Sequence, residues 1–149
     1  MTTNAPICIT ARVRFGDCDP AGIVFTPRYG GFVFEAAETW LEAVMGLSVH
    51  QQLNKGEIGT PVRSLTTDLH RSLRPGDRFA STVYVEAIGR TSFRLLVIGR
   101  RGDGVLSFVG RMTCVTTDPS HRSAMPLSEM YQQRLTQYQA DCGDIPAIA

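Results

Sequence analysis

Two aspartates stand one residue apart in the segment RFGDCDPAGIVFTPRYGGF, which covers residues 14–32. A carboxylate can act as a general base, as a nucleophile or as a cation ligand, so Asp17 and Asp19 are candidates for chemistry. Asp19 is also followed by Pro, Ala and Gly, a common turn composition, because Asp caps its own backbone and Gly accepts positive φ. The segment by itself therefore allows both a catalytic and a structural interpretation of Asp19.

The helix expected directly after this loop favours the catalytic interpretation. Thr26 is a good N-cap residue, and Pro27 suits the first helical position because its missing N–H costs nothing there. The free N–H groups and the positive dipole end of a helix start can hold a developing negative charge. A carboxylate facing such an amide is a minimal hydrolytic site. Asp19 would be its base or nucleophile, and the backbone amide at Thr26 its oxyanion donor, since Pro27 has no N–H.

The hydrophobic pattern predicts the elements that position this loop. Residues 7–16 alternate apolar and polar positions, as in a half-buried strand that ends at Gly16 with Phe15 on its apolar side. From Tyr29 onward, apolar residues recur at helical spacing up to Gly46, a typical C-terminal stop. This spacing predicts a largely enclosed helix of about eighteen residues.

The second half of the chain reads as strands joined by short turns. Its β-branched and aromatic segments are residues 78–88, 92–100 and 104–118, with turns at Arg74–Asp77 and Gly102–Gly104. Residues 58–73 are expected to form a further strand with Pro61 at its beginning or edge, and residues 126–139 a surface helix.

The order of these elements predicts a single α+β domain over residues 1–149, in which an antiparallel sheet of about five strands wraps around one long central helix. A single sheet around a single helix leaves a face or an edge uncovered, which predicts a homodimer or homotetramer.

Composition and charge restrict the partners. Fifteen Lys and Arg against fourteen Asp and Glu give a net charge of +1, too little to attract nucleic acid or an anionic membrane. The N-terminal residues lack the pattern of a signal peptide, and no run is apolar enough to span a membrane, so we expect a cytoplasmic protein. The four cysteines lie far apart, which favours reduced packing residues over a zinc or redox site.

The stretch GDCDPAGIVFTPRY resembles the signature G-D-x-D-x-x-G-[IV]-V-x-x-x-x-Y of the 4-hydroxybenzoyl-CoA thioesterase family, whose members have the hotdog fold. The resemblance implies an acyl-CoA thioesterase that releases a carboxylic acid and free CoA without a cofactor or a metal. It places the catalytic acid on Asp19 and the amide that polarises the thioester carbonyl on Thr26. Asp17 matches the first acid of the pattern, for which we expect a structural role.

Two further segments resemble parts of the family that contact the substrate. GTPV, residues 59–62, resembles a family segment that lines the acyl pocket from the neighbouring subunit. GRTSF, residues 89–93, lies where the family has basic residues near the phosphates of CoA. The substrate-binding residues implied in this way are Gly59, Thr60, Pro61, Arg90, Thr91 and Ser92. The same segments are also compatible with a plain strand start and a polar hairpin. Phe34 stands where the hydroxybenzoyl enzyme has an acid, with Glu35 one position later, so the acyl group does not follow from the resemblance.

Several alternatives remain at this point. The carrier of the acyl group could be an acyl carrier protein instead of CoA, or the protein could bind acyl-CoA without hydrolysing it. Cys18 as a nucleophile is disfavoured because two flanking carboxylates oppose its thiolate. Asp17 and Asp19 could hold a divalent cation, but the sequence offers no accompanying acidic cluster.

Overall fold

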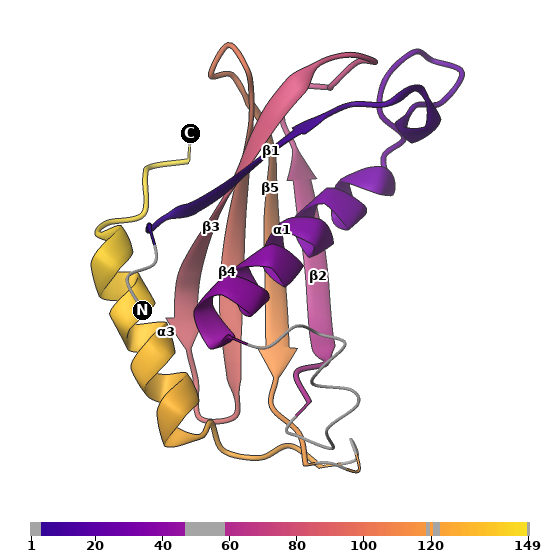
Figure 1. The fold of residues 1–149 in the computed structure, drawn as a ribbon. Helices are drawn as coiled ribbons and strands as arrows, with labels where there is room; N and C mark the ends of the chain where they lie inside the picture. Colours follow the sequence, from indigo (N-terminus) through magenta and orange to yellow (C-terminus); the bar gives the residue numbers. More distant parts are fainter. Residues whose placement is uncertain (1–3, 47–58, 119, 121–122, 149) are drawn as a thin grey trace.

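A computed structural model describes residues 4–46, 59–118, 120 and 123–148 of the chain. In chain order the elements are β1 (Ile7–Arg12), the 3-10 helix η1 (Phe15–Asp17), α1 (Arg28–Met45), β2 (Val62–Leu69), β3 (Arg78–Ile88), β4 (Ser92–Arg101), β5 (Leu106–Val115) and α3 (Glu129–Cys142). Figure 1 shows the sheet curving around α1, with α3 beside the β1 and β3 side of the sheet. The predicted α+β class and the sheet wrapped around one long helix are confirmed.

The five strands form one antiparallel sheet in the order β1-β3-β4-β5-β2. β2 is therefore an edge strand, and most of its residues are exposed. Three of its apolar side chains, Val62, Leu65 and Leu69, lie at the surface. A long edge of unpaired backbone groups with apolar side chains is typical of a strand that pairs with another chain.

The central helix α1 is eighteen residues long and ends at Gly46 in the left-handed conformation (φ 76°), as its sequence predicts. Trp40, the single tryptophan of the chain, is fully buried at the centre of its packing face. Gly110 of β5 allows the helix to lie close to the sheet, because a Cβ there would overlap the side chain of Val33. The depth at which α1 sits in the sheet is thus set by a glycine on the strand below it.

The C-terminal helix α3 is more deeply integrated than the predicted surface helix. It buries Tyr131, Leu135 and Tyr138, and its N-cap Ser128 accepts a hydrogen bond from the Tyr131 amide. The Tyr138 hydroxyl donates to the Val83 carbonyl (2.6 Å) and accepts from the Ile7 amide (2.9 Å), so α3 holds β1 and β3 together.

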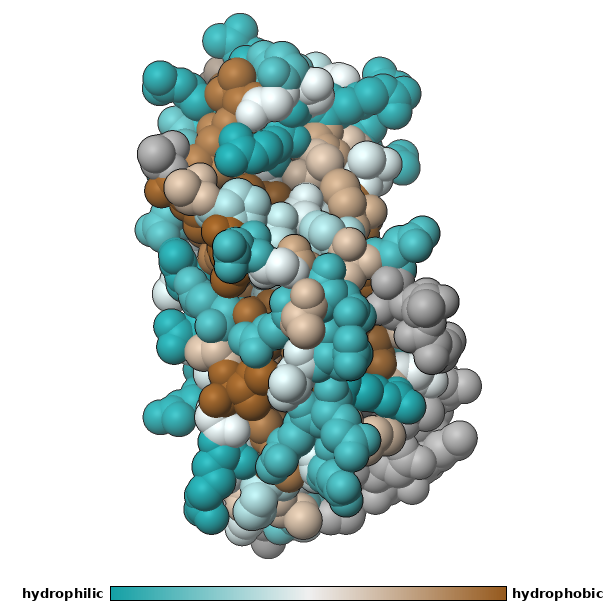
Figure 2. Space-filling model, turned by 90° about the vertical axis from the view of Figure 1, so that its left-hand side faces the viewer, coloured by the Kyte–Doolittle hydropathy of each residue, from teal (hydrophilic) through white to brown (hydrophobic). Residues whose placement is uncertain are grey.

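The outer surface around α3 and β1 is mainly hydrophilic, with smaller hydrophobic areas between (Figure 2). Among the residues that the structure describes, no helix is both long and apolar enough to cross a membrane.

Two predicted boundaries around the aspartate loop are wrong. The first strand ends at Arg12 instead of Gly16, and Phe15 is 89% exposed instead of facing the core. The cause is Asp17, whose side chain accepts from the Arg14 amide and whose own amide donates to the Arg14 carbonyl, closing a turn. The helix begins at Arg28 with Pro27 as its N-cap, one residue later than expected. The Thr26 side chain does not cap it.

Candidate active site

The loop between β1 and α1 is held by a short antiparallel bridge between Cys18 and Val24. Inside this bridge the Asp19 amide donates to the Ile23 carbonyl (3.0 Å), and the Gly22 amide donates to the Asp19 carbonyl (3.0 Å). Gly22 has a φ of 78°, a conformation that favours glycine. The DPAG sequence therefore forms the tight turn that its composition predicts, with Asp19 at its start.

The carboxylate of Asp19 is half-buried and has one fixed contact. Its Oδ1 atom accepts a hydrogen bond from the Ala21 amide (2.9 Å). No described residue bonds to Oδ2. This geometry orients the carboxylate while leaving one oxygen available to a substrate or a water molecule. Asp19 can therefore cap its turn with Oδ1 and still act as a base or nucleophile with Oδ2.

The neighbouring carboxylate of Asp17 is occupied on both oxygens. Oδ1 forms an ion pair with Arg28 Nε (2.9 Å), and Oδ2 accepts from the Arg14 amide (2.8 Å). Burial alone would raise the pKa of Asp17, but the hydrogen bonds from Arg28 and Arg14 outweigh it, so the pKa lies below its ordinary value. Its backbone carbonyl also accepts from the Phe25 amide (2.9 Å). These contacts are those of a residue that fastens the loop to the start of α1.

The start of α1 offers the amide that the sequence suggested. The Arg28 amide donates to the Phe25 carbonyl (2.8 Å) and the Tyr29 amide to the Thr26 carbonyl (3.3 Å), whereas the Thr26 amide bonds to no described residue. Thr26 is exposed and directly precedes Pro27, which has no N–H. The free amide therefore lies at the positive end of the helix dipole, where an oxyanion is stabilised.

A hollow of about 200 Å³ opens beside this amide. Thr26, Ile23 and Tyr29 line it on one side, and Leu69, His70 and Arg71 on the other. Because Asp19 bonds to Ile23, the turn that carries the carboxylate adjoins the hollow. The hollow thus connects the aspartate turn, the start of α1 and the end of β2.

The other predicted site residues lie together at the opposite end of the sheet. The Pro61 carbonyl accepts from the Val115 amide (3.0 Å), the Gly59 carbonyl from the Thr117 amide (3.0 Å), and the Thr91 carbonyl from the Thr116 amide (2.9 Å). The segments Gly59–Pro61 and Arg90–Ser92 therefore flank the end of β5 from its two sides.

Within one chain, the structure does not bring these two groups of residues together. The loop of Asp19 and Thr26 is next to the start of β3, since the Val24 amide donates to the Leu73 carbonyl (2.9 Å), whereas Arg90 follows the end of β3. The eleven residues of β3 separate the two ends by roughly 35 Å. Figure 1 shows the aspartate loop at the upper right and the β3–β4 turn at the bottom.

A small apolar pocket of about 80 Å³ lies between α1 and the sheet on the β2 side. Its lining includes Phe34 and Leu41 of α1, Thr60, Val62 and Cys114. In the sequence Phe34 stands out only as a departure from the family pattern. Helical spacing does not predict its place in a pocket with Thr60, because Phe34 lies outside the apolar face of the helix. Glu35 points elsewhere and forms an ion pair with Arg28 (2.9 Å).

The structure also bears on the two alternative roles of this loop, a Cys18 nucleophile and a cation site. Partial burial and the negative charges of Asp17, Asp19 and Asp77 raise the pKa of the Cys18 thiol, as the sequence predicts. No group of three or more potential metal ligands occurs in the described parts of the chain.

Comparison with known proteins identifies the family. A family model described as the thioesterase-like superfamily matches residues 13–135. The chain is 38% identical over 60 residues to the 4-hydroxybenzoyl-CoA thioesterase of Pseudomonas sp. (strain CBS-3), a match that covers 39% of this chain and 42% of that relative. It is 28% identical over 128 residues to the 1,4-dihydroxy-2-naphthoyl-CoA hydrolase of Rippkaea orientalis, covering 85% and 92% of the two chains.

Among solved structures, a Staphylococcus aureus protein determined in complex with CoA superimposes with a TM-score of 0.88 at 16% identity, covering 99% of this chain and 92% of that one. This likeness shows the fold, a single sheet around one helix. The chain belongs to the thioesterase-like superfamily, and its architecture is the hotdog fold.

Proposed function

We propose that the protein hydrolyses acyl-CoA thioesters to a carboxylic acid and free CoA. One observation carries the proposal: an oriented carboxylate, Asp19, and a free helix-start amide, Thr26, lie on the same short loop beside a hollow. The named activities of the relatives point to the same reaction.

In the proposed reaction the thioester carbonyl oxygen accepts a hydrogen bond from the Thr26 amide. The dipole of α1 stabilises the negative charge that grows on this oxygen in the transition state. Asp19 either attacks the carbonyl carbon or takes a proton from an attacking water molecule, and both routes require the free Oδ2 atom to face the carbonyl. In the base route the thiolate of CoA leaves as the carbonyl re-forms, and the proton taken up by Asp19 passes to the thiolate, which gives the acid and free CoA. In the nucleophilic route the departing thiolate leaves a mixed anhydride between the acyl group and Asp19, which a water molecule then hydrolyses to the acid and the free aspartate.

We infer further that two copies of the chain build each site. The length of β3 puts Arg90–Ser92 roughly 35 Å from the aspartate loop, and the eight residues of β2 separate Gly59–Pro61 from the hollow at Thr26 by roughly 25 Å, too far for one compact pocket in one chain. The exposed edge of β2 supports antiparallel pairing with a second copy, which would bring residues Gly59–Pro61 of that copy beside the end of β2 and the hollow at Thr26. A homodimer is the simplest assembly of this kind, and a homotetramer would contain it.

The acyl group is proposed to be aromatic. Phe34 and Thr60 line an apolar pocket, and the two relatives act on aromatic acyl-CoA esters by their names. The pocket holds only about 80 Å³ in one chain, so the partner copy would have to enlarge it. Arg90, Thr91 and Ser92 are proposed to contact the phosphates of CoA.

Release of free thiol from a panel of acyl-CoA esters tests the function. We expect turnover with benzoyl, 4-hydroxybenzoyl or 1,4-dihydroxy-2-naphthoyl esters to exceed turnover with acetyl-CoA, and Asp19→Asn to reduce it by roughly a hundredfold or more. Asp77→Asn is the matched control, because Asp77 also accepts a backbone amide, that of Arg74 (2.8 Å), in a turn at the same end of the sheet. Tight binding of the esters without thiol release would instead identify a non-catalytic acyl-CoA-binding protein.

A further inference from the structure

One buried side chain in the wall of the hollow at Thr26 has a hydrogen-bond donor to spare. Tyr29 is 2% exposed, and its hydroxyl oxygen accepts a hydrogen bond from the Leu73 amide (3.0 Å). A tyrosine hydroxyl can also donate one hydrogen bond, and no described residue accepts from the hydroxyl of Tyr29. A buried donor without an acceptor is costly, so a group that enters the hollow is needed to accept this bond.

Tyr138 shows the same arrangement with the donor in use. It is 1% exposed, and its hydroxyl also accepts from a backbone amide, that of Ile7 (2.9 Å). In addition, the Tyr138 hydroxyl donates to the Val83 carbonyl (2.6 Å). The donor of Tyr138 is therefore spent within the fold, whereas the donor of Tyr29 is not.

The packing of the Tyr29 ring leaves its hydroxyl end for the hollow. The ring lies against Phe32 and Phe108, with centroid distances of 6.0 and 5.5 Å, and neither phenylalanine lines the hollow. The hydroxyl is at the Leu73 amide, directly after Ser72, which does line the hollow. Of the described residues in this lining, Tyr29 is the only buried one with a polar side chain.

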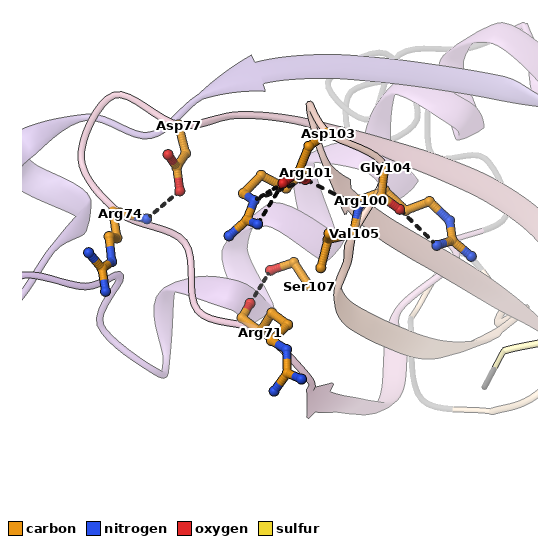
Figure 3. A network of polar contacts seen from close by, with 9 residues as sticks. All are labelled: Arg71, Arg74, Asp77, Arg100, Arg101, Asp103, Gly104, Val105 and Ser107. Atoms are coloured by element: carbon orange, nitrogen blue, oxygen red, sulfur yellow. Dashed lines mark hydrogen bonds and ion pairs between the residues drawn. The ribbon is translucent and has the colours of Figure 1, made fainter.

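Backbone hydrogen bonds fix the surroundings of this hydroxyl. The Leu73 carbonyl accepts from the Val24 amide (2.9 Å), which ties Leu73 to the aspartate loop. The Arg71 carbonyl accepts from the Ser107 hydroxyl (2.7 Å), a contact that Figure 3 shows with the Arg71 side chain directed away from it. The Tyr29 hydroxyl is therefore held in place before a substrate binds, as a group that stabilises a transition state must be.

The Tyr29 hydroxyl and the free Thr26 amide serve the same hollow. Tyr29 stands three residues after Thr26, and the Tyr29 amide donates to the Thr26 carbonyl (3.3 Å). Aromatic side chains of a helix lean toward its N-terminus, so the Tyr29 ring extends back toward the level of Thr26. The side chains of His70, Arg71 and Ser72 are exposed and can bond to water with or without a substrate, whereas the Tyr29 hydroxyl depends on what the hollow holds.

Resting on the thioesterase function proposed above, we propose that the Tyr29 hydroxyl is a second oxyanion donor of the site. The thioester carbonyl oxygen accepts one hydrogen bond from the Thr26 amide and one from the Tyr29 hydroxyl. Both bonds strengthen as negative charge grows on this oxygen in the transition state, and the hydroxyl keeps its proton throughout. The bond that the hydroxyl accepts from the Leu73 amide polarises its O–H and makes it a better donor.

The test compares Tyr29→Phe with the matched control Tyr138→Phe. Each change removes a buried hydroxyl and leaves a backbone amide without its acceptor, so both should lower Tm. We expect Tyr29→Phe to lower kcat for the best acyl-CoA ester by roughly a hundredfold and to change KM by less than about threefold, as for the loss of one oxyanion donor. Tyr138→Phe should keep kcat within about twofold of wild type, because its hydroxyl bonds only to the backbone of β1 and β3.

The infrared stretching frequency of the thioester carbonyl separates a bond to the substrate from a loss of structure. An acyl-CoA labelled with ¹³C at this carbonyl is bound to Asp19→Asn, whose slow turnover leaves the ester intact during the measurement. Adding Tyr29→Phe to Asp19→Asn should raise the frequency, because the oxygen loses one hydrogen bond, whereas adding Tyr138→Phe should not. 3-Fluorotyrosine in place of Tyr29 keeps the ring and the hydroxyl, so this measurement remains possible where Tyr29→Phe fails to fold. Its more acidic hydroxyl should lower the frequency.

Three results would overturn the role of Tyr29 and leave the thioesterase function in place. The first is near-normal kcat in folded Tyr29→Phe, and the second is a carbonyl frequency that 3-fluorotyrosine at this position does not change. The third is a lower kcat in Tyr29→Phe without a change of the carbonyl frequency, which would mean that the hydroxyl only supports the fold. A wild-type protein that releases thiol from none of the esters would refute the proposed function and this role together.

Discussion

Replacing Asp17 with Asn separates the residue that fastens the catalytic loop from the residue that is proposed to do the chemistry. The carboxylate accepts from Arg28 Nε (2.9 Å) and from the Arg14 amide (2.8 Å) at the same time. An Asn side chain has a single acceptor oxygen, so one of these donors loses its partner and faces the amide NH₂ group instead. We expect Asp17→Asn to fold but to lose stability.

The structure limits the size of this loss. A hydrogen bond to a charged group contributes about 1.5–3 kcal/mol. The Arg28 side chain is 33% exposed and keeps its ion pair with Glu35, so water and Glu35 compensate part of the loss. We expect the free energy of unfolding to fall by about 1–2 kcal/mol, which corresponds to a decrease in Tm of roughly 2–8 °C for a chain of this size. Urea denaturation and a thermal melt at pH 7 measure both quantities.

The pH dependence gives this prediction a second readout. The pKa of Asp17 is lower in the folded protein than its ordinary value of 3.8, so its contribution to stability is present above that pH and is lost as the pH falls through the folded pKa. The stability difference between wild type and Asp17→Asn should therefore shrink below about pH 4.

Glu35→Gln is the matched control, because it removes only the more exposed partner of Arg28 and should cost about 0.5 kcal/mol or less. Equal stability of Asp17→Asn and wild type at pH 7, or a difference that persists unchanged on acidification, would refute this account of Asp17.

The other predictions concern activity. Asp19→Asn should lower kcat by roughly a hundredfold or more while Tm stays within a few degrees of wild type, and near-normal thiol release would remove Asp19 from the mechanism. Arg90→Ala should raise the KM for acyl-CoA with little change in kcat, and less so at high salt, because a phosphate contact acts equally on ground and transition states; a collapse of kcat at unchanged KM would contradict this. Co-refolding Asp19→Asn chains with Thr60→Trp chains should restore part of the activity, since one site of a mixed dimer combines two intact halves. Heterodimers without recovery would show that each site belongs to one chain.

Periodicity and turn composition were sufficient to predict most of the fold. The alternation in residues 78–88 and 92–100 and the Asp-Gly turn at Gly102–Gly104 appear in the structure as β3, β4 and the hairpin that follows β4. These signals are local, and each depends on residues that are close in sequence. The end of the first strand was mispredicted because Phe15 continues the alternation, whereas the side chain of Asp17 closes a turn that the alternation does not register.

The candidate site was predictable only in parts. Asp19 and Thr26 are seven residues apart, and the loop between them is short enough for turn rules to apply. The positions of Gly59–Pro61 and Arg90–Ser92 relative to Thr26 depend on sheet order, which no local pattern encodes, so their location at the opposite end came from the structure.

The buried Trp40 has a practical consequence as an optical reporter. It is the single tryptophan, fully shielded from water, with its ring edge-on to Tyr138 of α3 and close to Phe93 of β4. Its indole N–H bonds to no described residue, so an apolar environment sets its emission. Detachment of α3 from α1 would admit water to the indole and shift the emission to longer wavelengths. Intrinsic fluorescence should therefore distinguish local release of the C-terminal helix from changes in the aspartate loop, which lies beyond the other end of α1.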